Sequence, residues 1–232
     1  MKELNGRRLV KIWREWIKPI LVVLIVLSTF RSAVADWNDV PTGSMKPTVL
    51  EGDRIFVNKL AYDLKFPFTT WRVAHWADPQ PGDIVILFSP ADGTRLVKRV
   101  VGTPGDEIAM VNNRLIINGR PLKYAMLSAE GVEGAEPIGG WRPVLAGETL
   151  GQTTHMVMVY PGMSSKHTVG VFVVPPGKYF VMGDNRDGSR DSRYFGFVDR
   201  SEIVGKVPAV VLSVDPSRYY LPRLGRFFKG LD

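Results

Sequence analysis

The chain has 232 residues, 45% of them hydrophobic, so it is long enough and apolar enough to bury a core, which excludes disorder throughout. Without cysteine it can form no disulfide, no thiolate nucleophile and no cysteine-ligated metal site. Its net charge of +7 sits at the two ends: residues 1–35 carry +5 and residues 216–232 carry +3, which leaves the body at −1 and gives it no basic surface for nucleic acid.

The first predicted element is a hydrophobic helix near the N-terminus. Its uncharged run, PILVVLIVLSTF, covers residues 19–30 and follows a basic stretch. A helix over residues 16–35 is about 30 Å long, which spans a thin bilayer if Lys18 and Arg31 extend toward opposite interfaces. Because basic residues precede the run, we expect residues 1–15 to stay in the cytoplasm and everything after Ala35 to lie outside.

Two other interpretations of this segment compete. Ala33-Val34-Ala35 before Asp36 has the small-x-small form of a secretory cleavage site, so residues 1–35 also fit a removable signal peptide. A buried core helix is the third interpretation, and the basic run and the missing polar face disfavour it. The anchor and the signal peptide both place the body outside the cytoplasm, and these residues alone do not separate them.

Beyond residue 36 the pattern is that of short β-strands between turns rich in Gly and Pro. Three of these turns contain the same Gly-Asp dipeptide: Gly52-Asp53, Gly82-Asp83 and Gly105-Asp106. Each precedes an apolar run, which predicts strands at 54–57, 84–88 and 107–111. Asn118-Gly119 predicts a tight hairpin. Short, turn-bounded strands favour a folded-over antiparallel sheet or a small barrel.

The second half of the body is less regular. Residues 128–151, rich in Gly, Glu and Ala, show no clear period and are interpreted as loops or a mobile insertion. Strands are predicted at 154–160, 169–174 and 178–181. The most unusual run of the chain follows them: GDNRDGSRDSRYFG, residues 183–196.

The basic tail has apolar residues at helical spacing: Leu221, Leu224, Phe228 and Leu231. This spacing predicts a helix that either binds the membrane interface or docks on the body, and both interpretations stay open.

The usual catalytic motifs are missing from the sequence. His75, His155 and His167 lie in no recognisable nucleophile, base or metal motif, and there is no HExxH, GxGxxG, Walker or Ser-x-x-Lys sequence. The aspartates of residues 183–191 alternate with arginines, so we expect ion pairs there rather than a Ca²⁺ site. Neither a metal nor another cofactor is predicted.

A serine with a lysine as its base remains, a known substitute for the serine–histidine pair. Ser44 lies in PTGSMKPT, residues 41–48, where two prolines stiffen the loop; an ordinary turn serine is the alternative. Lys46 is a poor candidate for the base, because an extended chain points it to the other face.

Lys98 is the better candidate for the base. In a strand Leu96, Lys98 and Val100 share a face, so aliphatic neighbours would remove water from the amine. Lowering its pKa from about 10.4 to about 7–8 costs ~4 kcal/mol, which burial can supply. A lysine that extends into solvent from an exposed face is the alternative. Arg99 points the other way and is free to pair with an acid.

Four segments taken together resemble the sequence boxes of bacterial type I signal peptidases, a family of Ser/Lys-dyad peptidases. In the family's order and spacing they are residues 41–48, Gly52-Asp53, 98–106 and 183–193. The coincidence of all four outweighs the ordinary interpretations of Ser44 and Lys98. The resemblance implies a membrane-bound serine endopeptidase, a hydrolase that cleaves signal peptides from exported preproteins after small-x-small (Ala-x-Ala) sites.

The resemblance also implies a role for each residue of the site. Ser44 matches the nucleophile, Lys98 the general base, and Thr42, where many members have Ser, the hydroxyl that joins the Ser44 N–H in the oxyanion hole. Ser189 matches the serine that orients the lysine amine. The implied supporting ion pairs are Arg99–Asp184 and Asp191–Arg193.

The architecture we expect is mostly β, with an N-terminal membrane helix, a folded-over antiparallel sheet or barrel-like catalytic domain, and a smaller inserted β region. Its parts are the basic N-terminus 1–15, the transmembrane anchor 16–35, the catalytic β domain 36–120, the inserted region 121–168, the second part of the catalytic domain 169–215, and the basic amphipathic tail 216–232. The family keeps the anchor uncleaved, which implies a single-pass protein of the bacterial inner membrane. The implied partners are preproteins with signal peptides and membrane lipid, without nucleic acid or metal.

Two alternative functions are weighed against this one. A maturation peptidase of conjugative pilins, or a self-cleaving repressor, would keep the Ser/Lys dyad; the membrane segment disfavours the repressor, and the complete 183–193 segment favours the signal peptidase. A membrane-anchored β-domain that binds envelope components without catalysis is the alternative from another class.

Overall fold

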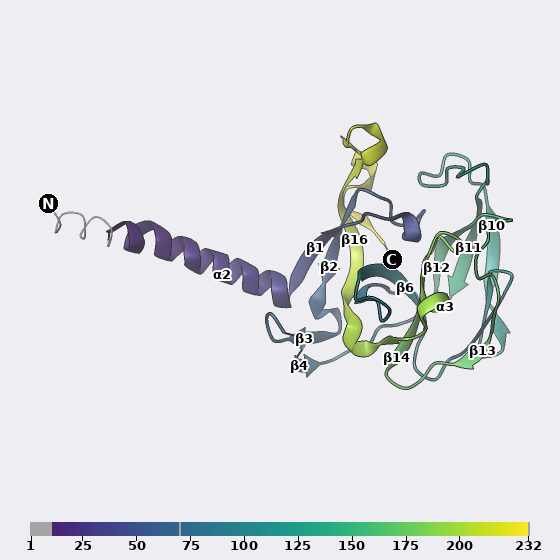
Figure 1. The fold of residues 1–232 in the computed structure, drawn as a ribbon, viewed down its shortest axis with the longest axis horizontal. Helices are drawn as coiled ribbons and strands as arrows, with labels where there is room; N and C mark the ends of the chain where they lie inside the picture. Colours follow the sequence, from purple (N-terminus) through teal and green to yellow (C-terminus); the bar gives the residue numbers. More distant parts are fainter. Residues whose placement is uncertain (1–10, 70, 232) are drawn as a thin grey trace.

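The computed structural model describes residues 11–69 and 71–231, so most of the predicted segment 1–15 lies outside the described residues. A short π-helical turn, η1 (Trp13–Ile17), continues into α2 (Lys18–Ala33), and the helix extends away from a β-rich body (Figure 1). Residues Trp13–Ala33 are long and apolar enough to cross a membrane, and only 6% of their apolar window is buried. That exposure excludes the core-helix interpretation.

The end of the helix is held directly against the sheet. Strand β1 (Ala35–Asp39) begins two residues after α2 and pairs antiparallel with β2 (Asp53–Asn58). Lys59 Nζ donates to the carbonyl oxygens of Arg31 and Ser32, 2.7 and 3.3 Å away, which satisfies two acceptors in the last turn of the helix. The helix therefore ends at a defined place on the body.

The main sheet is antiparallel and has the order β1-β2-β16-β5-β6-β14-β15. The strands not yet given are β5 (Ile84–Phe88), β6 (Arg95–Gly102), β14 (Lys178–Met182), β15 (Val198–Asp199) and β16 (Ile203–Asp215). Register shifts interrupt the pairing of β16 with β2 and β5 and of β14 with β6. Such irregularities bend a sheet, and the chain forms the mostly β, curled antiparallel architecture that the sequence predicted.

Strand β5 explains why this sheet is buried on both sides. Ile84 and Ile86 pack into one apolar cluster with Ile55 and Val210, whereas Val85 and Leu87 pack into another with Val100. Successive side chains of a strand point to opposite faces, so a continuous apolar run is what a doubly covered strand requires. The predicted strand at 84–88 is confirmed.

Two smaller sheets extend the body on the side away from α2 (Figure 1). One has the order β13-β7-β8-β9, from β7 (Glu107–Val111), β8 (Arg114–Ile117), β9 (Arg120–Pro121) and β13 (Val169–Val173). Its β8–β9 turn is the predicted hairpin, with positive φ at both Asn118 and Gly119. The other contains β10 (Lys123–Leu127), β11 (Val144–Leu150) and β12 (Thr153–Val159). A separate ribbon pairs β3 (Asp63–Lys65) with β4 (Arg72–His75).

Strand β11 corrects the expectation that residues 128–151 are loops throughout. The run VLAGETL pairs on both sides, with β10 and with β12. Its alternation is broken because Gly147 and Glu148 are both buried next to each other. Because the buried residue in the middle of the strand is an acid, the sequence does not alternate between apolar and polar residues, and the strand was not predicted.

The tail is not helical, which corrects the other expectation. Residues after β16 form β17 (Leu221–Pro222), a 3₁₀ turn η6 (Leu224–Arg226) and β18 (Lys229–Gly230), and both strands pair with β16. Tyr219, Tyr220 and Phe228 have positive φ, which is incompatible with a continuous α-helix. Leu231 is buried in the core, whereas the other three apolar residues of the predicted face are exposed.

Candidate active site

Ser44 lies in a tight turn between β1 and β2. The 3₁₀ turn η2 (Gly43–Met45) holds it, and the buried Met45 and Val49 anchor the turn in the apolar core. Thr42 precedes the turn in an extended conformation, and its side chain is exposed. The loop therefore presents a half-buried hydroxyl and, two residues earlier, an accessible one.

Lys98 comes to this turn from the middle of β6. Its Nζ lies 2.7 Å from Ser44 Oγ and 3.0 Å from the carbonyl oxygen of Val97, and the side chain is only 2% exposed. Burial lowers the pKa of Lys98 to about 8, although the carboxylates of Asp191 and Asp184 act in the opposite direction. An amine with that pKa is roughly one-fifth neutral at pH 7.4, against about a thousandth for a solvated lysine.

The residue after Lys98 points the other way and is paired. Arg99 donates to both carboxylate oxygens of Asp184, from Nε over 2.9 Å and from Nη2 over 2.7 Å, and both side chains are buried. Thr48 Oγ1 donates to the same carboxylate over 2.6 Å. Burial opposes ionisation of Asp184, but the Arg99 guanidinium outweighs it, so the pKa of this carboxyl lies below its usual value.

A second buried pair closes the Asp/Arg loop, which we define as residues 183–193. Arg193 donates to Asp191 from Nε and Nη2, each over 2.8 Å. Asp191 Oδ2 also accepts the backbone N–H of Gly183 over 3.0 Å. The structure thus brings together both pairs that the resemblance implied.

The Asp/Arg loop also contacts the turn of Ser44 through Asn185. Asn185 donates its N–H to the Ser44 carbonyl oxygen and its Nδ2 to the Gly43 carbonyl oxygen, each over 3.1 Å. Gly183 packs so closely that a Cβ there would collide with the Ser44 carbonyl oxygen and with the Ser189 hydroxyl. Only glycine fits at this contact.

Ser189 lies near the site but does not make the expected hydrogen bond to the Lys98 amine. Its side chain is buried against Gly183, and among the described residues its Oγ has no hydrogen-bond partner. The amine of Lys98 bonds instead to Ser44 and to the Val97 carbonyl oxygen. The lysine-orienting role of Ser189 stays a prediction.

The sequence interpretation missed a third buried ion pair, which joins the Asp/Arg loop to β11. Arg186 donates to Glu148 of β11 over 2.6 and 2.8 Å, and His155 of β12 lies 3.2 Å from the same carboxylate. The one available signal was an acidic residue inside the apolar run of residues 144–150.

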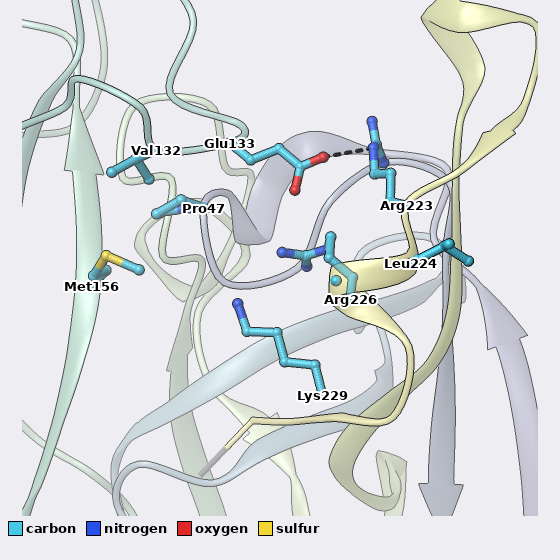
Figure 2. Close-up of a pocket in the computed structure, with 9 residues that line it drawn as sticks. Pro47, Val132, Glu133, Met156, Arg223, Leu224, Arg226 and Lys229 are labelled. Carbon is cyan, nitrogen blue, oxygen red and sulfur yellow. Dashed lines mark ion pairs between the residues drawn. The ribbon is translucent and has the colours of Figure 1, made fainter.

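A cavity of about 410 Å³ opens next to Pro47, between β12 and the C-terminal tail. Figure 2 shows Pro47 and Met156 on one side of it and Arg226 and Lys229 on the other, with an ion pair between Glu133 and Arg223 above. The lining combines these charged side chains with apolar ones.

Comparisons with known proteins show which family the chain belongs to. A family model described as "Signal peptidase, peptidase S26" matches residues 13–212, so the chain is a peptidase, a hydrolase of peptide bonds. The signal peptidases I of Pseudomonas fluorescens and Pseudomonas aeruginosa are each 36% identical to it over 239 residues, covering 97% of this chain and 81% of theirs. That of Rickettsia typhi is 36% identical over 211 residues, covering 82% of this chain and 77% of its own. The chain belongs to the bacterial signal peptidase I family.

A solved structure of a signal peptidase I from Enterococcus faecalis is also similar in sequence. It is 30% identical, with a TM-score of 0.34, and the match covers 56% of this chain and 96% of that one.

Proposed function

We propose that this peptidase is a serine endopeptidase that cleaves signal peptides from exported preproteins after small-x-small (Ala-x-Ala) sites, with Ser44 as the nucleophile and Lys98 as the general base. The observation that carries the proposal is the 2.7 Å distance between Lys98 Nζ and Ser44 Oγ at a buried amine. A lysine can serve as a base only when it is neutral, and burial increases the neutral fraction of Lys98 by lowering its pKa.

The chemistry proceeds in two steps. Neutral Lys98 accepts the Ser44 proton while Oγ attacks the carbonyl carbon of the last signal-peptide residue. The lysine then gives that proton to the leaving amine of the mature segment, so the peptide C–N bond breaks and an acyl-enzyme ester remains. Water next attacks the acyl-enzyme while Lys98 takes its proton, and Lys98 then returns that proton to the departing Ser44 Oγ, so that the signal peptide leaves as a free acid and both residues are restored. The Ser44 N–H and the Thr42 hydroxyl stabilise the oxyanion in both steps.

The buried ion pairs hold this geometry rather than taking part in it. Arg99–Asp184 and Asp191–Arg193 fix the Asp/Arg loop, whose backbone contacts Ser44. Ser189, the proposed orienting residue, lies in the same loop. None of these groups touches the scissile bond in the proposed reaction.

The N-terminal helix is the proposed membrane anchor, with its basic flank in the cytoplasm and the body on the outer side of the inner membrane. The folded state supports the anchor over a removable signal peptide, because Ala33 is buried and Ala35 is paired with Asn58. A protease needs an extended, accessible segment, whereas Ala33 is helical and Ala35 is held in the sheet. Purified protein that begins at Asp36 on N-terminal sequencing would contradict the anchor.

Digestion of a preprotein by the detergent-solubilised chain, with mass spectrometry of the products, tests the function. The expected products are separated by one cut after an Ala-x-Ala site. Ser44→Ala and Lys98→Met should each abolish the cut while remaining folded, and full processing by either variant would overturn the dyad.

A further inference from the structure

Glu148 and Arg186 form a fully buried ion pair that the proposed reaction leaves unused. Both side chains are almost completely inaccessible to water, and the two hydrogen bonds between them are bidentate. Burial opposes ionisation of Glu148, but the Arg186 charge and the contact with His155 hold its pKa far below the usual value. Desolvation largely cancels the attraction within such a pair, so its contribution to stability alone is a weak reason for its presence.

The carboxylate is the meeting point of the three-stranded sheet β10–β12. Tyr124 of β10 donates its hydroxyl to Glu148 Oε2 over 2.5 Å, and Glu148 itself belongs to β11. His155 of β12 places Nε2 3.2 Å from Glu148 Oε1 and 4.0 Å from Asp184 Oδ1. Side chains of β10 and β12 therefore converge on the carboxylate of β11.

Arg186 belongs to the Asp/Arg loop and also contacts other residues of that loop. Arg186 Nε donates to the Gly183 carbonyl oxygen over 3.2 Å, and Arg193 Nη2 donates to the Arg186 carbonyl oxygen. The backbone of β12 adds two hydrogen bonds of 2.8 Å through Met158, one to Asp184 and one from Arg186. The loop is thus fixed to this sheet on one side and to Ser44 on the other.

We propose that the sheet β10–β12 is a brace for the active site and that Glu148 is its positioning residue. By holding Arg186, Glu148 keeps Gly183 and Asn185 against the Ser44 turn, and so keeps Ser44 Oγ within reach of Lys98. The inference rests on the proposed Ser44–Lys98 reaction. It assigns a task to a part of the predicted inserted region 121–168 that touches neither the hydroxyl nor the amine.

The test is the Glu148→Gln variant, which preserves shape and removes the charge that holds Arg186. Displacements of about 1 Å at a reacting pair cost roughly a hundredfold, so we expect kcat to fall 10- to 100-fold in preprotein digestion by the full chain. KM should stay within twofold, because the substrate does not touch Glu148. Values of kcat are expressed per mole of folded enzyme, measured by near-ultraviolet circular dichroism and thermal unfolding.

Two further variants separate positioning from mere folding. Glu148→Gln/Arg186→Gln should be no slower than the slower single variant, because each change breaks the same link. Tyr124→Phe removes one hydrogen bond to the carboxylate and should lower kcat severalfold even if Glu148→Gln does not fold. Asp63→Asn is the matched control: it makes the same change in a buried ion pair, with Arg72 and Arg200, and should keep the wild-type kcat.

The outcomes also separate this inference from the proposed function. If Ser44→Ala abolishes cleavage but folded Glu148→Gln, or Tyr124→Phe in its place, keeps the wild-type kcat, the brace is wrong and the dyad stands. A loss confined to KM, or an equal loss of kcat in Asp63→Asn, also overturns the brace. Cleavage that persists in Ser44→Ala overturns the proposed function itself.

Discussion

Asn185 donates its backbone N–H to the carbonyl oxygen of Ser44 over 3.1 Å, across 141 positions of the chain. The residue before Asn185 is the carboxylate that pairs with Arg99, and Arg99 follows Lys98 in β6. The proposed nucleophile and the proposed base are thus held by neighbouring parts of one buried network. Changes in that network should therefore affect the reaction without touching the substrate.

Activity should depend on pH through Lys98. The proposed reaction needs the neutral amine, and the pKa of Lys98 is lowered to about 8 by burial. Below that value kcat/KM should fall about tenfold per pH unit, and above it the rate should level off. Cleavage of a preprotein between pH 6 and 10 checks this, and a rate independent of pH below 8 would exclude Lys98 as the base.

Lys98→Met should stabilise the fold while it abolishes activity. The pKa of Lys98 falls from 10.5 to about 8 on folding, so below pH 8 the folded protein holds a buried ammonium at a cost of about 3 kcal/mol. Between pH 8 and 10.5 the folded state binds fewer protons than the unfolded state, and this cost disappears as the pH rises. Chemical unfolding at pH 7 and pH 10 tests this prediction. Lys98→Met should raise the free energy of unfolding above the wild-type value at pH 7 and raise it much less at pH 10.

Gly183→Ala should slow the reaction at least tenfold. The new methyl group would collide with the Ser44 carbonyl oxygen and the Ser189 side chain, so the Ser44 turn must shift away from Lys98. Gly170→Ala is the control, since a methyl group there meets no neighbour. Comparison of kcat for the two folded variants decides the point, and equal rates would show that this close approach has no role in catalysis.

The Thr42 hydroxyl should matter for the rate more than for binding. Thr42→Val keeps the shape but removes the proposed oxyanion donor, and one such donor is worth roughly a hundredfold in kcat. Thr42→Ser should retain most of the activity, because it keeps the hydroxyl. Steady-state kinetics of both variants provide the test. If Thr42→Val is as fast as Thr42→Ser, the Thr42 hydroxyl is not an oxyanion donor and only the Ser44 N–H keeps that role.

Local patterns predicted the elements whose geometry depends on a few neighbouring residues. The apolar helix, the strand at 84–88 and the Asn118-Gly119 hairpin all appear in the structure. Local patterns failed at β11, where a buried acid interrupts the alternation, and in the tail, where apolar residues at helical spacing lie in short strands and a turn.

The sequence by itself determined the membrane-length helix, the β character of the body and the four segments that mark the family, because turn geometry, strand alternation and apolar length are properties of short stretches of chain. Only the tertiary structure decided that Lys98 is buried from solvent, that Ser44 lies beside it and that Glu148 pairs with Arg186. Loss of water and the pairing of charges depend on which distant segments fold against each other, and no local pattern contains that information.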